Sequence, residues 1–150
     1  MEYLSGGDLM FHIENTHNGK IEPALVKLYA AEIALALMYL HENKIIYRDL
    51  KPTNILLDAE GHIKLADFGL CKENIGYDEQ TGTFCGTPHY MAPEIVKTDL
   101  QEGTYGPSVD WWSFGAVIYE MTTGHVIINP DIDEEDYTKI FGEILYGRVR

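Results

Sequence analysis

Apolar residues recur at steps of three and four from residue 23 to about 41–44, a spacing typical of an amphipathic helix. Pro23 stands at the start, where a helix tolerates proline because the first turn needs no backbone N–H partner. The apolar stripe consists of Leu25, Leu28, Tyr29, Ile33, Ala36, Leu37 and Leu40. The pattern therefore predicts one long helix that buries a single face.

Two short apolar runs, Ile55–Leu57 and Ile63–Leu65, flank the turn residues 58–61 and predict a β-hairpin. Just before the hairpin, the stretch "IIYRDLKPTNILL" at 45–57 places three charges of both signs and a proline between apolar runs. A core strand has no use for such an insert. We therefore expect a loop held between two buried strands.

The chain from residue 67 to about 93 is rich in Gly, Thr and Asp and shows little periodicity. This indicates a long loop, and long loops are usually functional. A second helix is predicted over 109–123, ended by Gly124, and its nearly uniform apolarity indicates burial. An acidic run at 131–136 precedes a last predicted helix, 137–145, where negative charge suits a helix N-terminus.

The composition indicates a globular chain, because 45% of its 150 residues are hydrophobic and 23% are charged. A formal net charge of −13 disfavours nucleic acid and anionic membranes as partners and favours basic peptides. No apolar run reaches the roughly 18 residues of a membrane span, so none is expected.

Two cysteines, Cys71 and Cys85, occur without a CxxC motif or a Cys/His cluster. We interpret them as reduced thiols with packing roles in an intracellular protein, although a disulfide between them stays open. The expected location is the cytoplasm or the nucleus.

Three motifs occur in a fixed order: "YRDLKPTN" at 47–54, "DFG" at 67–69 and "APE" at 92–94. This is the order of the protein-kinase signature set, and the resemblance covers essentially the whole chain. Tyr before Arg-Asp, "FCGTPHYMAPE" at 84–94 and "DWWSFG" at 110–115 resemble the AGC group of serine/threonine kinases. The words "MEYLSGGDL", "IIYRDLKP" and "DFGLCKE" resemble the ribosomal protein S-six kinase branch.

The resemblance implies a mainly α fold, the C-terminal lobe of a protein-kinase-like fold with short β-hairpins. It would be incomplete, without the smaller β-rich lobe and the last helices. The implied division of this partial kinase domain, 1–150, is hinge 1–9, catalytic loop 47–54, Mg-binding loop 67–69, activation segment 67–94 and buried helix 109–123.

Phosphoryl transfer requires that Mg²⁺ ions, the γ-phosphate of ATP and a hydroxyl be held in line. The resemblance assigns Asp49 to the substrate hydroxyl and Lys51 to the transferring phosphate. Asn54 and Asp67 would supply the hard oxygen ligands that Mg²⁺ selects, brought together by the hairpin. Thr87 matches the residue that hydrogen-bonds the catalytic Asp and Lys. Taken singly, an Asp-Lys pair is more often a solvated surface contact, so these assignments depend on the ordered set.

Thr83, in "TFCGT", matches the position that is phosphorylated in AGC kinases. Arg48 and Lys72 are the cations that the family pattern offers to such a phosphate, and an upstream activating kinase is implied. The alternative is an ordinary exposed loop threonine.

The resemblance also implies structural roles. Tyr47 and Phe68 would pack in a hydrophobic column that holds Asp67 in place. Asp110 lies at the start of the apolar helix and, being buried, should accept hydrogen bonds from backbone amides of the loop that begins at Tyr47. Glu94 is the acid of the APE motif, and no later arginine in this sequence fits as its partner.

The first residues resemble the hinge that binds adenine. Backbone groups of Glu2 and Leu4 would contact ATP, with Asp8 beside them and Leu56 as the floor of the pocket. Asp8 and Glu120 also match acidic positions that receive arginines upstream of the phosphoacceptor, so the implied partners are protein substrates with basic residues upstream of Ser or Thr.

Residues 1–150 contain no G-x-G-x-x-G loop and no V-A-I-K lysine, the parts that clamp the ATP phosphates. Thr53 and His89 replace acids common in relatives, and "GHVIINP" at 124–130 replaces the usual Pro-Pro-Phe turn. The expected function is a protein serine/threonine kinase that is inactive or weak as this fragment. The alternative is a truncated, non-catalytic kinase-like module that binds partners or substrates.

Overall fold

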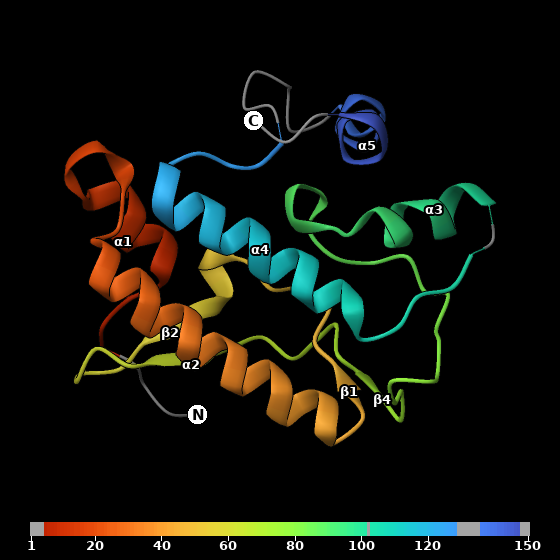
Figure 1. Ribbon diagram of the computed structural model, residues 1–150, viewed down its shortest axis with the longest axis horizontal. Coiled ribbons are helices and arrows are strands. Elements are labelled where there is room, and N and C mark those ends of the chain that lie inside the picture. Colours follow the sequence, from red (N-terminus) through yellow and green to blue (C-terminus); the bar gives the residue numbers. More distant parts are fainter. Residues whose placement is uncertain (1–4, 102, 129–135, 148–150) are drawn as a thin grey trace.

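Two long helices, α2 (Pro23–Glu42) and α4 (Ser108–Thr123), pack against each other at the centre of the computed structural model (Figure 1). The structure describes residues 5–101, 103–128 and 136–147. The other elements are α1 (Leu9–Asn15), α3 (Pro93–Gln101), α5 (Tyr137–Tyr146), β1 (Ile45–Ile46), β2 (Ile55–Leu57), β3 (Ile63–Leu65), β4 (Lys72–Glu73) and the 3₁₀ turns η1 (His17–Gly19), η2 (Pro52–Asn54) and η3 (Pro88–Tyr90). The described chain is mainly helical with short strands, which confirms the predicted fold class.

Helix α2 begins where the sequence predicted it. Pro23 occupies the first turn, and the Glu22 carboxylate accepts backbone N–H groups from Ala24 at 3.0 Å and Leu25 at 3.2 Å. These two bonds satisfy donors that have no partner within the helix. The buried face of α2 consists of Val26, Tyr29, Ile33, Leu37, Leu40 and His41.

Two residues of the predicted apolar stripe are exposed. Leu25 is 42% exposed and Leu28 is 40% exposed, so their expected burial was wrong. Val26 is buried in their place, because α4 and strand β3 pack on the side of α2 that carries Ile33 and Leu37. The predicted 3.6-residue period was correct, but in the first turns of the helix the buried face contains Val26 instead of Leu25 and Leu28.

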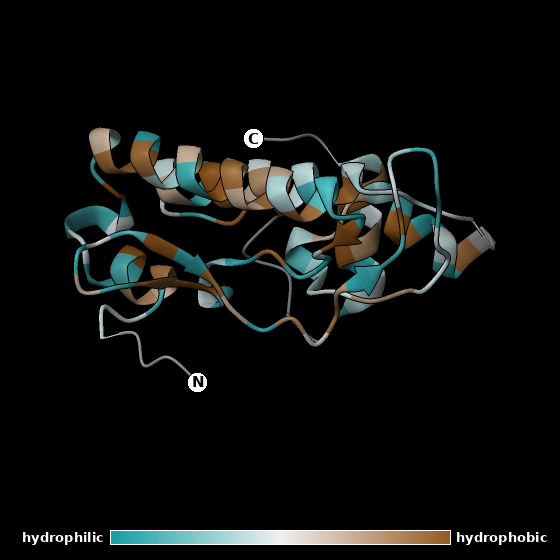
Figure 2. Cartoon of the chain, turned by 90° about the horizontal axis from the view of Figure 1, so that it is seen from below, coloured by the Kyte–Doolittle hydropathy of each residue, from teal (hydrophilic) through white to brown (hydrophobic). Residues whose placement is uncertain are grey.

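By length and composition alone, α2 is apolar enough to cross a membrane, contrary to the expectation that no run would qualify. Brown, hydrophobic segments recur along this helix in Figure 2. However, its inner face packs against α4, and the core helix of a globular protein passes the same test. This property is therefore weak evidence for a membrane.

The predicted hairpin is present, with Ile55 opposite Leu65 in the antiparallel pair β2–β3. Its turn is closed by Asp58, whose Oδ1 accepts the backbone N–H of Glu60 at 3.1 Å and of His62 at 2.9 Å. Strand β1 does not pair with the hairpin and instead pairs with β4 in a second small sheet. The charged stretch 47–54 is thus a loop between two strands, as predicted.

Helix α4 ends at Gly124, as predicted, in a left-handed conformation with φ 76°. A Cβ at this position would lie 2.8 Å from the carbonyl oxygen of Gly19, so the close approach of these two backbones requires glycine. The predicted last helix is α5. Asp136 caps it by accepting the Lys139 N–H at 3.2 Å, while residues 129–135, which include most of the acidic run, lie outside the described residues.

Helices α1 and α3 were not predicted. Both are short and follow loop-like sequence, and each begins with a local device rather than with a long apolar stripe. The Asp8 carboxylate accepts the Phe11 N–H at 2.8 Å at the start of α1, and α3 begins at Pro93. Helix α3 packs against α5, and together they cover the second apolar cluster around Ile95, whereas α2 and the hairpin cover the first (Figure 1).

Candidate active site

The charged loop after β1 is anchored by Asp110, near the start of α4. Its Oδ1 accepts the backbone N–H of Arg48 at 2.8 Å, and its Oδ2 accepts that of Tyr47 at 2.9 Å. Asp110 is 0% exposed, so these bonds replace the water that the carboxylate loses on burial. The predicted backbone partners are confirmed. They also hold Arg48 at φ 68°, a conformation that is costly for a residue with a side chain.

His41, which was not predicted, completes this anchor from the last turn of α2. Its Nε2 lies 2.8 Å from Asp110 Oδ2, and both side chains are fully buried. The imidazole also packs edge-to-face on Trp111, and its Nδ1 has no hydrogen-bond partner among the described residues. The two residues are 69 positions apart, and a lone histidine at a helix end carries no signal of such a partner.

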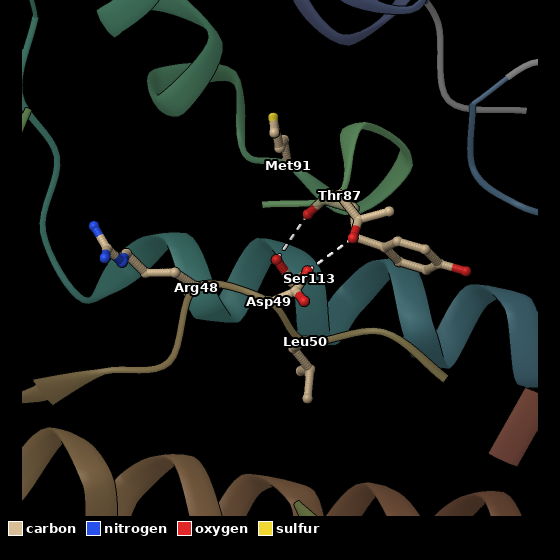
Figure 3. Close-up of a pocket in the computed structure, with 7 residues that line it drawn as sticks. Arg48, Asp49, Leu50, Thr87, Met91 and Ser113 are labelled. Carbon is tan, nitrogen blue, oxygen red and sulfur yellow. Dashed lines mark hydrogen bonds between the residues drawn. The ribbon is translucent and has the colours of Figure 1, made fainter. Parts of the chain in front are cut away.

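Three side chains that were predicted to act together with Asp49 meet at its carboxylate. Thr87 donates its hydroxyl to Asp49 Oδ1 at 2.7 Å, and Asn54 donates its amide to Oδ2 at 2.9 Å. Lys51 Nζ lies 3.1 Å from the same Oδ2 and donates to Thr87 Oγ1 at 2.8 Å. Figure 3 shows Asp49 close to Thr87, while the side chain of Arg48 points away from both.

This cluster is shielded from water but not closed. Asp49 is 6% exposed and Asn54 is 7% exposed, whereas a quarter of the Lys51 side chain remains accessible. A carboxylate in such surroundings is fixed in direction by its three partners. It can therefore accept a proton from, or orient, a hydroxyl presented at the open side, next to an ammonium group that attracts negative charge.

The hairpin brings the two predicted magnesium ligands to one end. Ala66, the neighbour of Asp67, donates its N–H to the carbonyl of Asn54 at 2.9 Å. The Asn54 side-chain nitrogen is used by Asp49, which leaves the amide oxygen for a cation. Asp67 is exposed at φ 53°, with one oxygen accepting the Gly69 N–H at 3.2 Å.

An amide oxygen and a carboxylate fit Mg²⁺, which prefers hard oxygen ligands and takes several of its ligands from substrate phosphates and water. Within the described ranges, no group of three or more His, Cys, Asp or Glu side chains is arranged to hold a metal by itself. This donor set therefore suits a metal ion that arrives with a phosphate-bearing substrate.

The Arg48 guanidinium donates two hydrogen bonds, one to the predicted activation segment and one to Tyr105, which is itself bonded to that segment. Its Nε donates to the Leu70 carbonyl at 2.6 Å, and its Nη1 donates to the Tyr105 hydroxyl at 3.1 Å. The Tyr105 hydroxyl donates in turn to the carbonyl of Thr83. Tyr105 was not predicted, because a tyrosine in a loop before a helix has no sequence signal for this contact. The Thr83 side chain is exposed.

Lys72 lies in β4, opposite Ile46 in the small sheet, and is exposed. The structure records no ion pair for it within the described residues, so its predicted role toward Thr83 stays a prediction.

Gly86, two residues before the η3 turn, crosses the charged loop at close range. Its φ is 119°, and a Cβ there would lie 3.0 Å from the carbonyl oxygen of Arg48.

The predicted hydrophobic column is only half buried. Tyr47 is 0% exposed and donates its hydroxyl to the Ala66 carbonyl, which holds the chain just before Asp67. Burial raises the pKa of this phenol well above its ordinary value. Phe68 packs edge-to-face on Tyr47 with ring centroids 5.5 Å apart but is 53% exposed. The predicted contact between the two rings is thus present, whereas the expected core packing of Phe68 was wrong, because half of its surface is exposed.

Glu120 is buried, at 5% exposure, and accepts the Tyr90 hydroxyl at 2.6 Å. Burial raises the pKa of the Glu120 carboxyl, and the bond from Tyr90 partly opposes the shift.

Asp8 caps α1 with one carboxylate oxygen, and its backbone pairs with that of Leu56 in an isolated bridge. The substrate and nucleotide roles of Asp8 and Glu120 stay predictions.

Some predicted residues remain untested. Glu2 and Leu4 of the predicted hinge lie outside the described residues. Glu94 lies in the first turn of α3 and makes no ion pair with any described residue. Cys71 and Cys85 are both free, so the disulfide that the sequence left open is not formed between them. Burial raises the pKa of Cys71 to about 11, so this thiol is a poor nucleophile at neutral pH.

Fold and site together define a helical lobe that presents an Asp-Lys-Asn-Thr cluster next to an exposed Asp67, an arrangement typical of protein kinase domains. Comparison with known proteins agrees: the protein kinase domain family matches residues 1–147. The chain belongs to the protein kinase domain family.

Relatives at about half identity are protein kinases C of the AGC group. Protein kinase C eta type from Mus musculus is 52% identical over 147 residues, which cover 97% of this chain and 21% of that protein. Protein kinase C zeta type from Oryctolagus cuniculus is 49% identical over 155 residues, covering 100% and 25%. The epsilon type from the same species is 52% identical over 149 residues, covering 99% and 19%. The chain thus spans a quarter or less of the length of these relatives.

Proposed function

We propose that this chain is the larger-lobe part of a serine/threonine kinase that transfers the γ-phosphate of Mg-ATP to Ser or Thr in basic peptides. The observation that carries the proposal is the Asp49 carboxylate, buried and held by Lys51, Asn54 and Thr87 at 2.7 to 3.1 Å. Family membership supports it, because protein kinases use ATP and Mg²⁺.

In this proposal each residue of the cluster has a separate task. Asp49 orients the substrate hydroxyl and takes its proton, and Thr87 fixes the direction of the carboxylate. Lys51 balances the negative charge that the transferring phosphate brings. Asn54 and Asp67 hold Mg²⁺, whose contribution when bound is to neutralise the phosphates.

ATP would lie on Leu56 and contact backbone groups of Glu2 and Leu4. Asp8, at the start of α1, would border the same pocket. Residues 1–150 contain no glycine-rich loop and no matching lysine to clamp the phosphates. We therefore propose that the 150-residue chain by itself binds ATP weakly and turns over negligibly.

Regulation would act through Thr83. Its exposed side chain is open to an upstream kinase, and the guanidinium of Arg48 is fixed on its backbone carbonyl through Tyr105. A phosphate adds about −1.5 to −2 charges and forms strong bonds to arginine, so it would strengthen this contact, with Lys72 as a second cation.

Basic substrates fit the charge of the chain. Its formal net charge is −13, and Asp8 and Glu120 would receive arginines upstream of the phosphoacceptor. We propose a cytoplasmic or nuclear location. Assignment to the ribosomal protein S-six kinase branch stays a finer proposal, because the relatives described above are protein kinases C.

The test is transfer of labelled phosphate from ATP to a serine peptide with upstream arginines. The full-length kinase that contains this chain should phosphorylate the peptide, and residues 1–150 alone should not. A matched peptide with upstream glutamates should be a poor substrate. Robust phosphorylation by the 150-residue chain would contradict the proposed weakness of the fragment, and no transfer by the full-length protein would favour the non-catalytic binding module.

A further inference from the structure

We propose that Tyr105 is a positioning residue, which ties the Arg48 guanidinium to the activation segment before any phosphate is present on Thr83. The proposal deepens the proposed function, since it interprets the same arginine and the same threonine. The contacts that support it are formed in the folded chain and do not depend on catalysis.

The Tyr105 hydroxyl connects Arg48 to the backbone of the activation segment. A phenol has one proton to donate and lone pairs to accept, so it can serve two partners at once. Here it accepts from Arg48 Nη1 at 3.1 Å and donates to the carbonyl of Thr83. The Cys85 sulfur lies 3.8 Å from the same oxygen, so the hydroxyl is enclosed on a third side.

The backbone of Tyr105 is fixed as firmly as its side chain. Thr81 and Tyr105 exchange both backbone hydrogen bonds at 2.9 Å, which joins the activation segment to the loop before α4. Tyr105 is 2% exposed, so water does not compete for its hydroxyl. Two attachments, one through the backbone at Thr81 and one through the phenol at Thr83, define the path of the segment between them.

The phenol keeps its proton under ordinary conditions, because burial raises the pKa of Tyr105 to about 12. Arg48 is therefore held by a neutral partner rather than by an ion pair. A hydrogen bond from a guanidinium to a neutral phenol lacks the attraction between opposite charges, which an arginine and a phosphate have, so a phosphate on Thr83 would add to this contact and reinforce the path already set.

The alternative is a purely structural tyrosine that fills space among Ile95, Val96 and Val109. Tyr105 belongs to the same apolar cluster as these residues, so its ring contributes to the core in either case. Replacing tyrosine by phenylalanine keeps the ring and removes the hydroxyl alone. This substitution therefore separates the two roles.

The experiment is amide hydrogen exchange of the full chain, comparing wild type with Tyr105→Phe. The reporter is the Thr81 amide, which donates to the Tyr105 carbonyl in both proteins. We expect its exchange to become about tenfold faster, the effect of losing a hydrogen bond that involves a charged group. The amide of His62, in the exposed hairpin turn, can open without breaking the Tyr105 contact and should exchange at the wild-type rate. The matched control is Tyr29→Phe, a buried tyrosine of α2, which should leave Thr81 exchange unchanged.

Unchanged Thr81 exchange in Tyr105→Phe would overturn the proposal. An equal acceleration at Thr81 and His62 would also overturn it, because general loosening of the fold would then explain the effect. The urea unfolding of the variant is measured in parallel, and its unfolding equilibrium should change by no more than about tenfold, because one folded-state hydrogen bond is lost. Since no phosphate transfer is measured, a failure of this test is distinct from a failure of the proposed kinase activity.

Discussion

The Thr87 hydroxyl donates a 2.7 Å hydrogen bond to Asp49 Oδ1, across 38 residues of sequence. Thr87 belongs to the activation segment and Asp49 to the charged loop after β1, so this one bond joins the two parts. The Lys51 ammonium donates to the same hydroxyl oxygen at 2.8 Å. The orientation of the carboxylate thus depends on a residue that only the folded activation segment supplies.

Replacing Thr87 by valine tests this dependence. Thr87→Val keeps the shape of the side chain but removes its hydroxyl, so Asp49 and Lys51 each lose one partner. We expect the phosphotransfer rate of the full-length kinase to fall about 10- to 100-fold, the value of a hydrogen bond to a charged group. Thr98→Val is the control, because among the described residues the Thr98 hydroxyl bonds to the Ile95 carbonyl, within α3 and away from Asp49. Equal rates for wild type and Thr87→Val would argue against a role for this bond.

Removing the Asp110 carboxylate should destabilise the fold. Asp110→Ala leaves the backbone amides of Tyr47 and Arg48 and the buried His41 without their acceptor. We expect the free energy of unfolding to fall by about 3–5 kcal/mol, as when one partner of a buried pair is removed. Urea denaturation measures it, with the exposed Asp99→Ala as control. A loss below about 1 kcal/mol would show that water replaces the carboxylate at little cost.

Glu120 predicts a pH dependence of stability. Burial raises the pKa of its carboxyl above the ordinary value of 4.5, so the folded state binds this proton more tightly than the unfolded state. The resulting stabilisation is fully present below the unfolded pKa and is lost as the pH rises through the folded pKa. Relative to Glu120→Gln, the wild type should therefore become less stable as the pH rises from about 4.

The measurement is urea unfolding of both proteins from pH 4 to pH 7, with the difference in unfolding free energy plotted against pH. Asp136→Asn is the control: the side chain and the backbone N–H of Lys139 lower the pKa of Asp136, so the stabilisation it gives is lost only as the pH falls below about 4, and its difference from wild type should stay nearly constant over this range. A difference between wild type and Glu120→Gln that does not change with pH would contradict the raised pKa.

The half-exposed Phe68 predicts a small stability effect. Phe68→Ala removes a ring that contacts Tyr47 but is 53% exposed, so the free energy of unfolding should fall by about 1 kcal/mol. Ile33→Ala, at a fully buried position of α2, should cost about 2–5 kcal/mol. Thermal unfolding of the two variants compares them. Equal losses would indicate that Phe68 is packed as tightly as the core.

Local sequence patterns predicted the elements that carry their own signals. The long periodic stripe located α2, the two short apolar runs on either side of the turn at 58–61 located the hairpin, and Gly124 marked the end of α4. Helices α1 and α3 lack such a stripe, because short helices bury little apolar surface and depend on caps and neighbours. The exposure of Leu25 and Leu28 depends on which side α4 packs, which a stripe alone does not determine.

The cluster around Asp49 was predicted from the ordered motifs, since each member lies in a recognisable word of the family. His41 and Tyr105 were missed, because each acts through one side-chain atom on a residue far away in sequence. His41 contacts Asp110 across 69 residues, and Tyr105 contacts Arg48 across 57. Only the packing of the helices brings such pairs together.

The most direct test of the central claim is the phosphotransfer rate of the full-length kinase with Asp49→Asn. This variant keeps the size of the side chain and one acceptor oxygen, but its amide nitrogen cannot accept the hydrogen bonds that Lys51 and Asn54 donate to Oδ2, and the side chain cannot take a proton. The claim predicts a loss of about 10²–10⁴-fold in rate, the usual contribution of a general base, while urea still unfolds the variant in one cooperative transition. A variant that transfers phosphate to the basic peptide at the wild-type rate would contradict it.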